Sequence, residues 1–149
     1  MEIQRKRHSG RGVLRKDSKI ELLKQVPLFS ECTKRELAAI AQLTELVDVP
    51  SGKDLVTEGD RAYEFAVLVE GTADVKQGGK KINTMTAGDF FGEIALVSDS
   101  PRTATVTTTS PAVVLVLTRQ AFWSLVDQMP TIERRVLKTL AERLRPQLV

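Results

Sequence analysis

The chain of 149 residues is 42% hydrophobic and 28% charged, which is typical of a globular protein and excludes a disordered one. This length is enough for one domain with a hydrophobic core and too short for two ordinary domains. No apolar segment is long enough to span a membrane, no signal segment opens the chain, and Cys32 is the single cysteine. We therefore expect a cytoplasmic protein without disulfides.

The net charge of +3 is concentrated at the start of the chain. Residues 1–19 carry a balance of +5, which leaves −2 for the remainder. We predict that residues 1–16 form a flexible basic tail, because they show no sustained apolar periodicity. Our interpretation is a solvated tail or a linker. The alternative is a segment that contacts nucleic acid, acidic lipid or an acidic partner.

Two helices are predicted within residues 18–44. Ser18 and Glu21 have the spacing of a capping box, which predicts a short helix to about Val26 that Pro27 ends. Residues 33–36 repeat this spacing, and an apolar face then continues to Leu43.

From residue 45 the pattern changes to short β-branched or apolar segments separated by glycines. The pair Gly78-Gly79 predicts a tight hairpin turn, and Asp60 and Asp89 are interpreted as turn residues. Regular short strands of this kind favour a sandwich or a jelly roll. The predicted strands cover residues 46–49, 55–57, 65–70, 72–76, 81–85, 103–108 and 113–117.

Two more helices are predicted after the last strand. Thr118 can cap a helix that runs to about Gln128, and Pro130 opens a final helix. That final helix is amphipathic, so we expect its apolar stripe to pack on the body of the protein or on a partner. The stripe consists of Ile132, Val136, Leu140 and Leu144.

One stretch carries recognisable chemistry. Glu93 and Arg102 stand nine positions apart, with Gly92 before the acid and Thr103 after the arginine. An arginine can bind a phosphate through two parallel N–H bonds, and a hydroxyl can add a third. A carboxylate instead accepts a hydrogen bond from a sugar hydroxyl. The pair describes a site for a ribose phosphate, and the alternative is an internal salt bridge between the two charges.

This stretch resembles the phosphate-binding cassette of the cyclic nucleotide-binding domain family. That family includes the regulatory subunits of cyclic AMP-dependent protein kinase, the catabolite activator protein and the cyclic nucleotide-gated channels. The resemblance implies that the acid binds the ribose 2′-OH and the arginine binds the cyclic phosphate. The implied ligand-binding residues are Phe91, Gly92, Glu93, Ile94, Ala95, Arg102, Thr103 and Ala104.

The resemblance also implies a mainly β fold with flanking helices. The expected arrangement is a cyclic nucleotide-binding domain over residues 17–149, built around an eight-stranded jelly-roll β-barrel. The barrel spans residues 45–117 and contains the cassette at 91–106. An N-terminal helical bundle over residues 18–44 precedes it, and C-terminal lid helices over 118–145 follow, the last of them covering the base.

Two classes of function fit these features. The first is a cyclic nucleotide sensor or regulatory module that relays binding by a rearrangement of the lid helix. Its ligand would be cyclic AMP rather than cyclic GMP, although Thr103 is compatible with both. The second is a protein that binds nucleic acid or an anionic partner through the basic tail, with a degenerate nucleotide site.

The sequence offers no support for an enzyme. It contains no nucleophile elbow, Walker A string or zinc-site spacing, so we expect neither catalysis nor a cofactor beyond the nucleotide ligand. After the last predicted helix no helix-turn-helix for DNA follows. The expected partners are the nucleotide, an effector protein or fused domain, and a second copy of the chain joined through the last helix.

Overall fold

The computed structural model describes residues 15–144, with side chains as far as residue 142. These residues divide into two compact units. We call Thr44–Gln120 the β unit, and the described residues of Gly12–Leu43 and Ala121–Val149 the helical unit. The predicted basic tail of residues 1–16 lies outside the described residues except for its last two.

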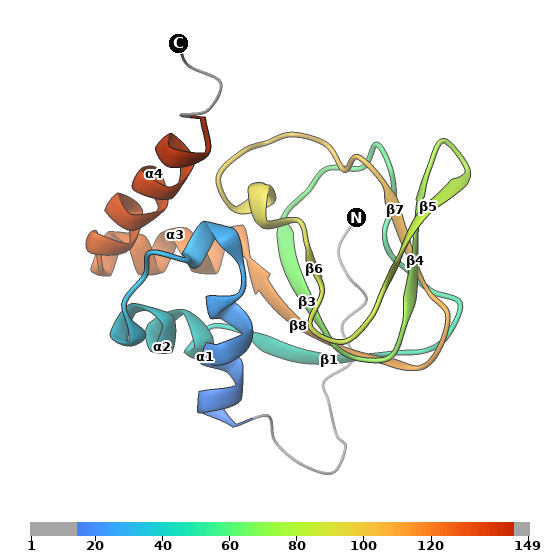
Figure 1. Cartoon of the computed structure of the whole chain (residues 1–149), viewed down its shortest axis with the longest axis horizontal. Helices are drawn as coiled ribbons and strands as arrows, with labels where there is room; N and C mark the ends of the chain where they lie inside the picture. Colours follow the sequence, from blue (N-terminus) through green and yellow to red (C-terminus); the bar gives the residue numbers. More distant parts are fainter. Residues whose placement is uncertain (1–14, 145–149) are drawn as a thin grey trace. The chain divides into compact units, whose positions relative to one another are not determined.

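The β unit contains two antiparallel sheets of four strands each (Figure 1). The first has the order β1-β8-β3-β6, formed by Glu45–Val49, Ala112–Thr118, Glu64–Glu70 and Phe90–Phe91. The second has the order β2-β7-β4-β5, formed by Asp54–Val56, Thr105–Thr108, Ala73–Gln77 and Lys80–Met85.

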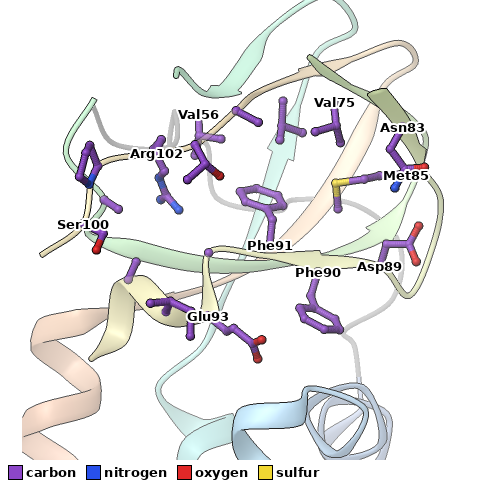
Figure 2. Close-up of a pocket in the computed structure, with 18 residues that line it drawn as sticks. Val56, Val75, Asn83, Met85, Asp89, Phe90, Phe91, Glu93, Ser100 and Arg102 are labelled. Carbon is purple, nitrogen blue, oxygen red and sulfur yellow. The ribbon is translucent and has the colours of Figure 1, made fainter. Parts of the chain in front are cut away.

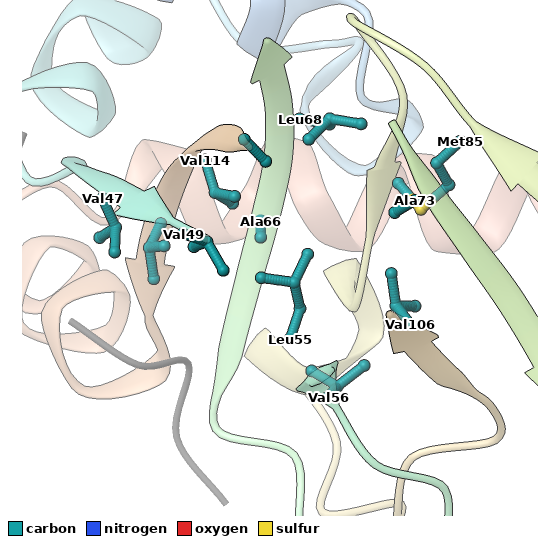
Figure 3. Packing of buried hydrophobic residues seen from close by; sticks show 12 residues of the cluster. Val47, Val49, Leu55, Val56, Ala66, Leu68, Ala73, Met85, Val106 and Val114 are labelled. Atoms are coloured by element: carbon teal, nitrogen blue, oxygen red, sulfur yellow. The ribbon is translucent and has the colours of Figure 1, made fainter. Parts of the chain in front are cut away.

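The predicted closed barrel is not found. Among the described residues, no strand of one sheet forms a ladder with a strand of the other, and the edge strands β6 and β2 are only two and three residues long. The sheets instead share a hydrophobic core (Figure 3), in which Val47 and Leu68 of the first sheet join Leu55 and Val106 of the second. The observed mainly β fold is therefore closer to the sandwich that the strand pattern also favoured.

The hairpin between β4 and β5 is confirmed. Gln77 pairs with Lys80, and the two intervening glycines have φ values of +59° and +80°. Positive φ at both central positions is the requirement of a type I′ turn, which only glycine and a few polar residues meet without strain.

The helical unit contains four α-helices and one short 3-10 helix. They are α1 (Lys16–Lys24), η1 (Pro27–Phe29), α2 (Lys34–Gln42), α3 (Arg119–Gln128) and α4 (Thr131–Leu144), of which α3 begins at the end of the β unit. α1 contacts α2, and α4 contacts η1. The rings of Phe29 and Phe122, both in this unit, lie 5.9 Å apart. That the N-terminal helices form the bundle implied by the resemblance stays a prediction.

One predicted capping box is confirmed and the other is wrong. At the start of α2, the Thr33 N–H donates to Glu36 Oε1 at 2.7 Å, and the Glu36 N–H donates to Thr33 Oγ1 at 3.2 Å. α1 instead begins at Lys16, two residues before Ser18, and Arg15 at its N-cap makes no side-chain capping bond. Lys16 and Asp17, directly before Ser18, are not helix breakers, so the helix extends past the candidate cap.

The last helix buries the first part of its predicted stripe. Ile132 and Val136 are buried and Leu140 is half-buried, while Leu137 is exposed; the side chain of Leu144 lies outside the described residues. In residues 15–144, no helix has the length and apolar character needed to cross a membrane.

Candidate functional site

A cavity of about 790 Å³ opens within the β unit (Figure 2). Its size lies in the range of small-molecule sites in proteins. All eight predicted site residues line it, namely Phe91, Gly92, Glu93, Ile94, Ala95, Arg102, Thr103 and Ala104. The fold thus brings together side chains from β6, η2 (Glu93–Leu96) and the loop that precedes β7.

The turn between β6 and η2 depends on Gly92. This residue has a φ of +78°, and a Cβ atom added to it would collide with Nη1 of Arg102 and lie 2.8 Å from the carbonyl oxygen of Glu64. Glycine is therefore required both for the backbone conformation and for the close approach of the arginine. The short 3-10 helix η2 forms directly after this turn.

Arg102 is buried at one end of the cavity, with 8% of its surface exposed. Its Nη2 donates to the carbonyl oxygen of Glu64 at 2.7 Å, while its Nε has no hydrogen-bond partner among the described residues. Burial lowers the pKa of Arg102 below its ordinary value, and the negative charge of Glu64 partly opposes this effect. A buried cation with an unsatisfied donor is unfavourable unless an acceptor, such as an anion, completes its environment.

Glu93 does not face Arg102 in this structure. Its side chain is half-buried, and Figure 2 shows its carboxylate pointing away from the guanidinium. The acid whose charge affects the pKa of Arg102 is the buried Glu64, one residue that the sequence did not single out. The arrangement therefore differs from the internal Glu93–Arg102 salt bridge that the sequence left open.

Sequence and structural comparisons can now be set beside this geometry. Residues 46–129, more than half of the chain, match the family model described as "Cyclic nucleotide-binding domain". The chain belongs to the cyclic nucleotide-binding domain family. The matched segment contains every residue of the predicted cassette.

Individual relatives agree with this assignment. A cAMP-dependent protein kinase regulatory subunit of Colletotrichum orbiculare is 34% identical over 132 residues, which cover 85% of this chain and 34% of the relative. The chain spans about a third or less of the length of the curated relatives it matches.

Solved structures share the fold. The N-terminal domain of a transcriptional regulator from Streptomyces coelicolor A3(2) superposes with a TM-score of 0.77, at 24% identity, over 85% of this chain and 94% of that one. The cAMP-bound PfPKA-R has a TM-score of 0.63 and 26% identity, over 89% of this chain and 47% of that one.

In this cyclic nucleotide-binding domain, the part of the cavity away from Arg102 is apolar. Val56, Val75, Met85 and Phe91 lie between Arg102 at one end and Asn83 at the other (Figure 2). The Asn83 Oδ1 accepts a hydrogen bond from the Thr84 N–H at 2.8 Å, so its NH₂ group is the part left to meet a ligand.

Sequence reasoning missed Asn83 and the apolar wall. The signal available was the alternation of β5, which puts Asn83 and Met85 on one face of the strand, opposite Val75 and Ala73 of β4. Nothing in the sequence indicated that this face lines a cavity. Asp89 is a turn residue as predicted, since its Oδ2 accepts from the Thr86 N–H at 2.8 Å. The backbone N–H of Asp60 donates to the carbonyl oxygen of Thr57 at 3.1 Å.

Proposed function

We propose that this chain is a non-catalytic regulatory module that binds a cyclic nucleotide in the cavity of the β unit, with cyclic AMP preferred to cyclic GMP. The observation that carries the proposal is Arg102, which is buried at the cavity with an unsatisfied Nε. A singly charged cyclic phosphate would supply the missing acceptor and the countercharge together.

The phosphate end of the ligand is assigned to Arg102 and Thr103. Arg102 has one N–H group committed to the Glu64 carbonyl, and a guanidinium offers five N–H donors in a planar fork. The hydroxyl of Thr103, whose residue also lines the cavity, would add a further donor to the phosphate oxygens.

The ribose is assigned to Glu93. Its carboxylate would accept from the 2′-OH, which requires the side chain to turn from its present direction towards the cavity. Two orientations of Glu93, of which the ligand selects one, give the site the two states that a regulatory module needs.

The base is assigned to the apolar part of the cavity, with Asn83 at its edge. Stacking a purine on Val75, Met85 and Phe91 removes apolar surface from water. The NH₂ group of Asn83 can donate to ring nitrogens of adenine or to O6 of guanine. The preference for cyclic AMP therefore rests on the kinase regulatory subunit relatives and on the cAMP-bound neighbour.

The signalling step is assigned to α4. In this structure its residues Ile132 and Val136 are buried, and the helix contacts η1 within the helical unit. We propose that the bound nucleotide draws α4 into a second position, with an arginine of that helix against the base. Arg135 is set aside because its Nε lies 3.5 Å from Oε1 of Glu36. The candidates are Arg134, which is exposed, and Arg143, whose side chain lies outside the described residues.

Parallel calorimetric titrations test the proposal, with cyclic AMP, cyclic GMP and 5′-AMP added to the native protein. We expect saturable binding of cyclic AMP, weaker binding of cyclic GMP, and the weakest binding of the doubly charged, open-chain 5′-AMP. Absence of binding by both cyclic nucleotides would remove the proposed function. Equal affinity for the two would remove only the stated preference.

A further inference from the structure

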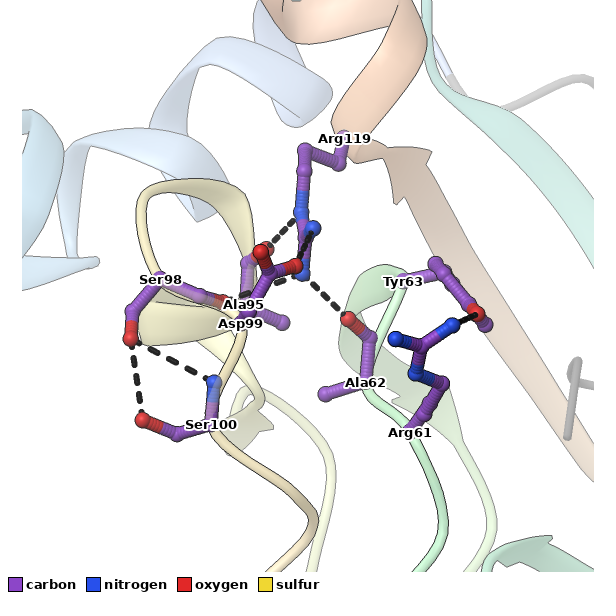
Figure 4. A network of polar contacts seen from close by, with 8 residues as sticks. All are labelled: Arg61, Ala62, Tyr63, Ala95, Ser98, Asp99, Ser100 and Arg119. Carbon is purple, nitrogen blue, oxygen red and sulfur yellow. Dashed lines mark hydrogen bonds and ion pairs between the residues drawn. The ribbon is translucent and has the colours of Figure 1, made fainter.

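Ser100 is an exposed residue of the loop between η2 and β7, and it lines the cavity. Its hydroxyl lies 2.9 Å from that of Ser98, and its N–H donates to the same Ser98 oxygen at 3.3 Å (Figure 4). The carbonyl oxygen of Ser98 accepts in turn from Nη2 of Arg119 at 3.0 Å. The loop is therefore anchored at Ser98, while the hydroxyl of Ser100 is accessible from solvent.

The backbone that follows Ser100 is extended. Pro101 pairs with Arg61 in an isolated antiparallel bridge, and the N–H of Arg102 donates to the carbonyl oxygen of Asp60 at 2.8 Å. A residue that precedes proline is itself restricted to extended conformations. Because alternate residues of an extended chain lie on one side, Ser100 and Arg102 share a side. Figure 2 shows both at the same end of the cavity.

We propose that Ser100 is a phosphorylation site for a proline-directed protein kinase, and that its phosphate pairs with Arg102 and blocks the ligand. Kinases of this class require a proline directly after the acceptor residue, which is Pro101 here. In the transfer, Oγ of Ser100 attacks the γ-phosphorus of ATP and the bond from that phosphorus to the β,γ-bridging oxygen breaks. ADP leaves, and the hydroxyl proton passes to a base of the kinase.

The phosphate supplies what the surroundings of Arg102 lack. It carries a charge of about −1.5 to −2 and three acceptor oxygens, whereas the Nε of Arg102 has no acceptor within residues 15–144. The side chain of Ser100 has only to leave Ser98, and a solvent-exposed hydrogen bond between neutral hydroxyls contributes little. Because the phosphate is tethered two residues from Arg102, it competes with a free nucleotide at a high effective concentration.

A second Ser-Pro pair, Ser110-Pro111, provides a matched control. Ser110 is half-buried, and its Oγ accepts from the Thr72 N–H at 2.9 Å. It is not among the residues that line the cavity. Its exposure favours Ser100 as the acceptor of the phosphate, and a phosphate on Ser110 has no route to Arg102.

Treatment with a mitogen-activated protein kinase and Mg²⁺-ATP tests the site in the native protein, Ser100→Ala and Ser110→Ala. Peptide mass spectrometry locates the phosphate, and calorimetric titration with cyclic AMP before and after treatment measures its effect. We expect the affinity of the native protein and of Ser110→Ala to fall about tenfold or more. The affinity of Ser100→Ala should be the same before and after treatment.

Phosphorus NMR tests the pairing without any ligand. The second pKa of a phosphoserine is about 6, and a neighbouring cation lowers it because the cation favours the dianion. The phosphate on Ser100 should therefore titrate at lower pH than the same phosphoserine in a synthetic peptide of residues 96–106. Arg102→Ala should return the pKa towards that of the peptide, and Arg61→Ala should not.

Absence of phosphate at Ser100, under conditions in which the kinase modifies a Ser-Pro peptide, would overturn the proposal. So would unchanged affinity of the phosphorylated protein, or a phosphate pKa equal to that of the peptide. The peptide comparison needs no variant, so it stands even if Arg102→Ala does not fold. The blocking of the ligand rests on the proposed function. If the unmodified protein binds no cyclic nucleotide, that function fails, and the phosphate pKa alone decides whether Ser100 and Arg102 pair.

Discussion

Arg102 lies in the cassette and Arg119 contacts it at Ala95 and Ser98, and the two arginines differ in the acceptors that they have. Arg119 has three carbonyl oxygens and the carboxylate of Asp99 as acceptors. Arg102 is more deeply buried, yet one carbonyl accepts from it at 2.7 Å and its Nε has no partner among the described residues. An arginine whose acceptors come from the protein is structural, whereas one left short of acceptors beside a cavity is poised to bind an anion.

A third arginine shows that the unsatisfied nitrogen alone does not identify a ligand site. Within residues 15–144 the Nε of Arg135 also has no hydrogen-bond partner, although it lies 3.5 Å from Glu36 Oε1. Arg135 belongs to the helical unit and is not among the residues that line the cavity. The combination of burial, an unsatisfied donor and an open cavity is what distinguishes Arg102.

The largest effect on ligand affinity is expected when Arg102 itself is replaced. Arg102→Ala should weaken cyclic AMP binding by roughly 30-fold to several thousand-fold, because removal of one member of a desolvated charge pair typically costs about 2–5 kcal/mol. Arg102→Lys should also weaken binding, since lysine lacks the planar fork. Calorimetric titration measures both, and Arg61→Ala is the control for loss of a nearby positive charge. Unchanged affinity in Arg102→Ala would end the proposed function.

A smaller effect is expected at Glu93, which sharpens the assignment of the two charges. If its carboxylate accepts from the ribose 2′-OH, 2′-deoxy cyclic AMP should bind about tenfold more weakly to the native protein, as for a hydrogen bond to a charged group. Glu93→Gln should reduce this discrimination. Competition titrations with the two ligands measure it, and equal affinities in the native protein would contradict the role of Glu93.

The next prediction concerns Gly92→Ala, whose added Cβ atom would collide with the guanidinium of Arg102. The substitution combines an unfavourable positive φ with a collision against the guanidinium, so we expect a loss of roughly 1–3 kcal/mol in unfolding free energy. Gly52→Ala is the matched control, because Gly52 has a φ of +80° and no atom within 4 Å of an added Cβ. Urea unfolding measures the loss of unfolding free energy in both variants. Equal losses would show that the collision with Arg102 adds no destabilisation to that of the positive φ.

A further prediction concerns Glu36, the acid that lies beside Arg135. Burial alone would raise the pKa of Glu36, but hydrogen bonds from Thr131 and Thr33 and the charge of Arg135 outweigh it, so the pKa lies below its ordinary value. A lowered pKa stabilises the fold above about pH 4.5, and this stabilisation is lost as the pH falls through the folded-state value. Native protein should exceed Glu36→Gln in unfolding free energy by about 1 kcal/mol at pH 7.

Urea titrations between pH 3 and 7 should show that difference shrinking below about pH 4.5. A difference that stays constant with pH would mean that the charge of Glu36 contributes nothing.

The smallest effect is expected from the positive charges of residues 1–14, which lie far from the cassette in the sequence. Deletion of residues 1–14 should change cyclic AMP affinity less than about twofold, because no residue of the cassette lies there. Titration of the shortened chain measures this. A large loss would make the tail part of the sensor, and salt-sensitive binding of nucleic acid by the full chain would instead support the alternative function.

The sequence predicted what depends on neighbouring residues. The capping box of Thr33 and Glu36 and the Gly78-Gly79 turn were confirmed, because each is set within a few positions of the chain. The failure at Ser18 has the same origin, since two equally local starts compete and spacing alone does not choose between them.

What the sequence could not provide are the contacts between distant positions. Glu64 meets Arg102 across 38 positions, and the acceptors of Arg119 lie 20 to 57 positions away. The division of the strands into two sheets likewise depends on pairings such as β1 with β8, which no local pattern records. These are the features that distinguish the surroundings of Arg119 from those of Arg102.

The pairing of β1 with β8 has a consequence for how the β unit can be moved between proteins. Glu45 lies opposite Val116 in this antiparallel ladder, so the chain enters and leaves the unit at neighbouring points. A unit with adjacent ends can be inserted into a surface loop of a host protein, or circularly permuted, without stretching its own backbone. A permutant that joins the two ends by a short linker and opens at the Gly78-Gly79 turn should therefore keep the two sheets of the β unit.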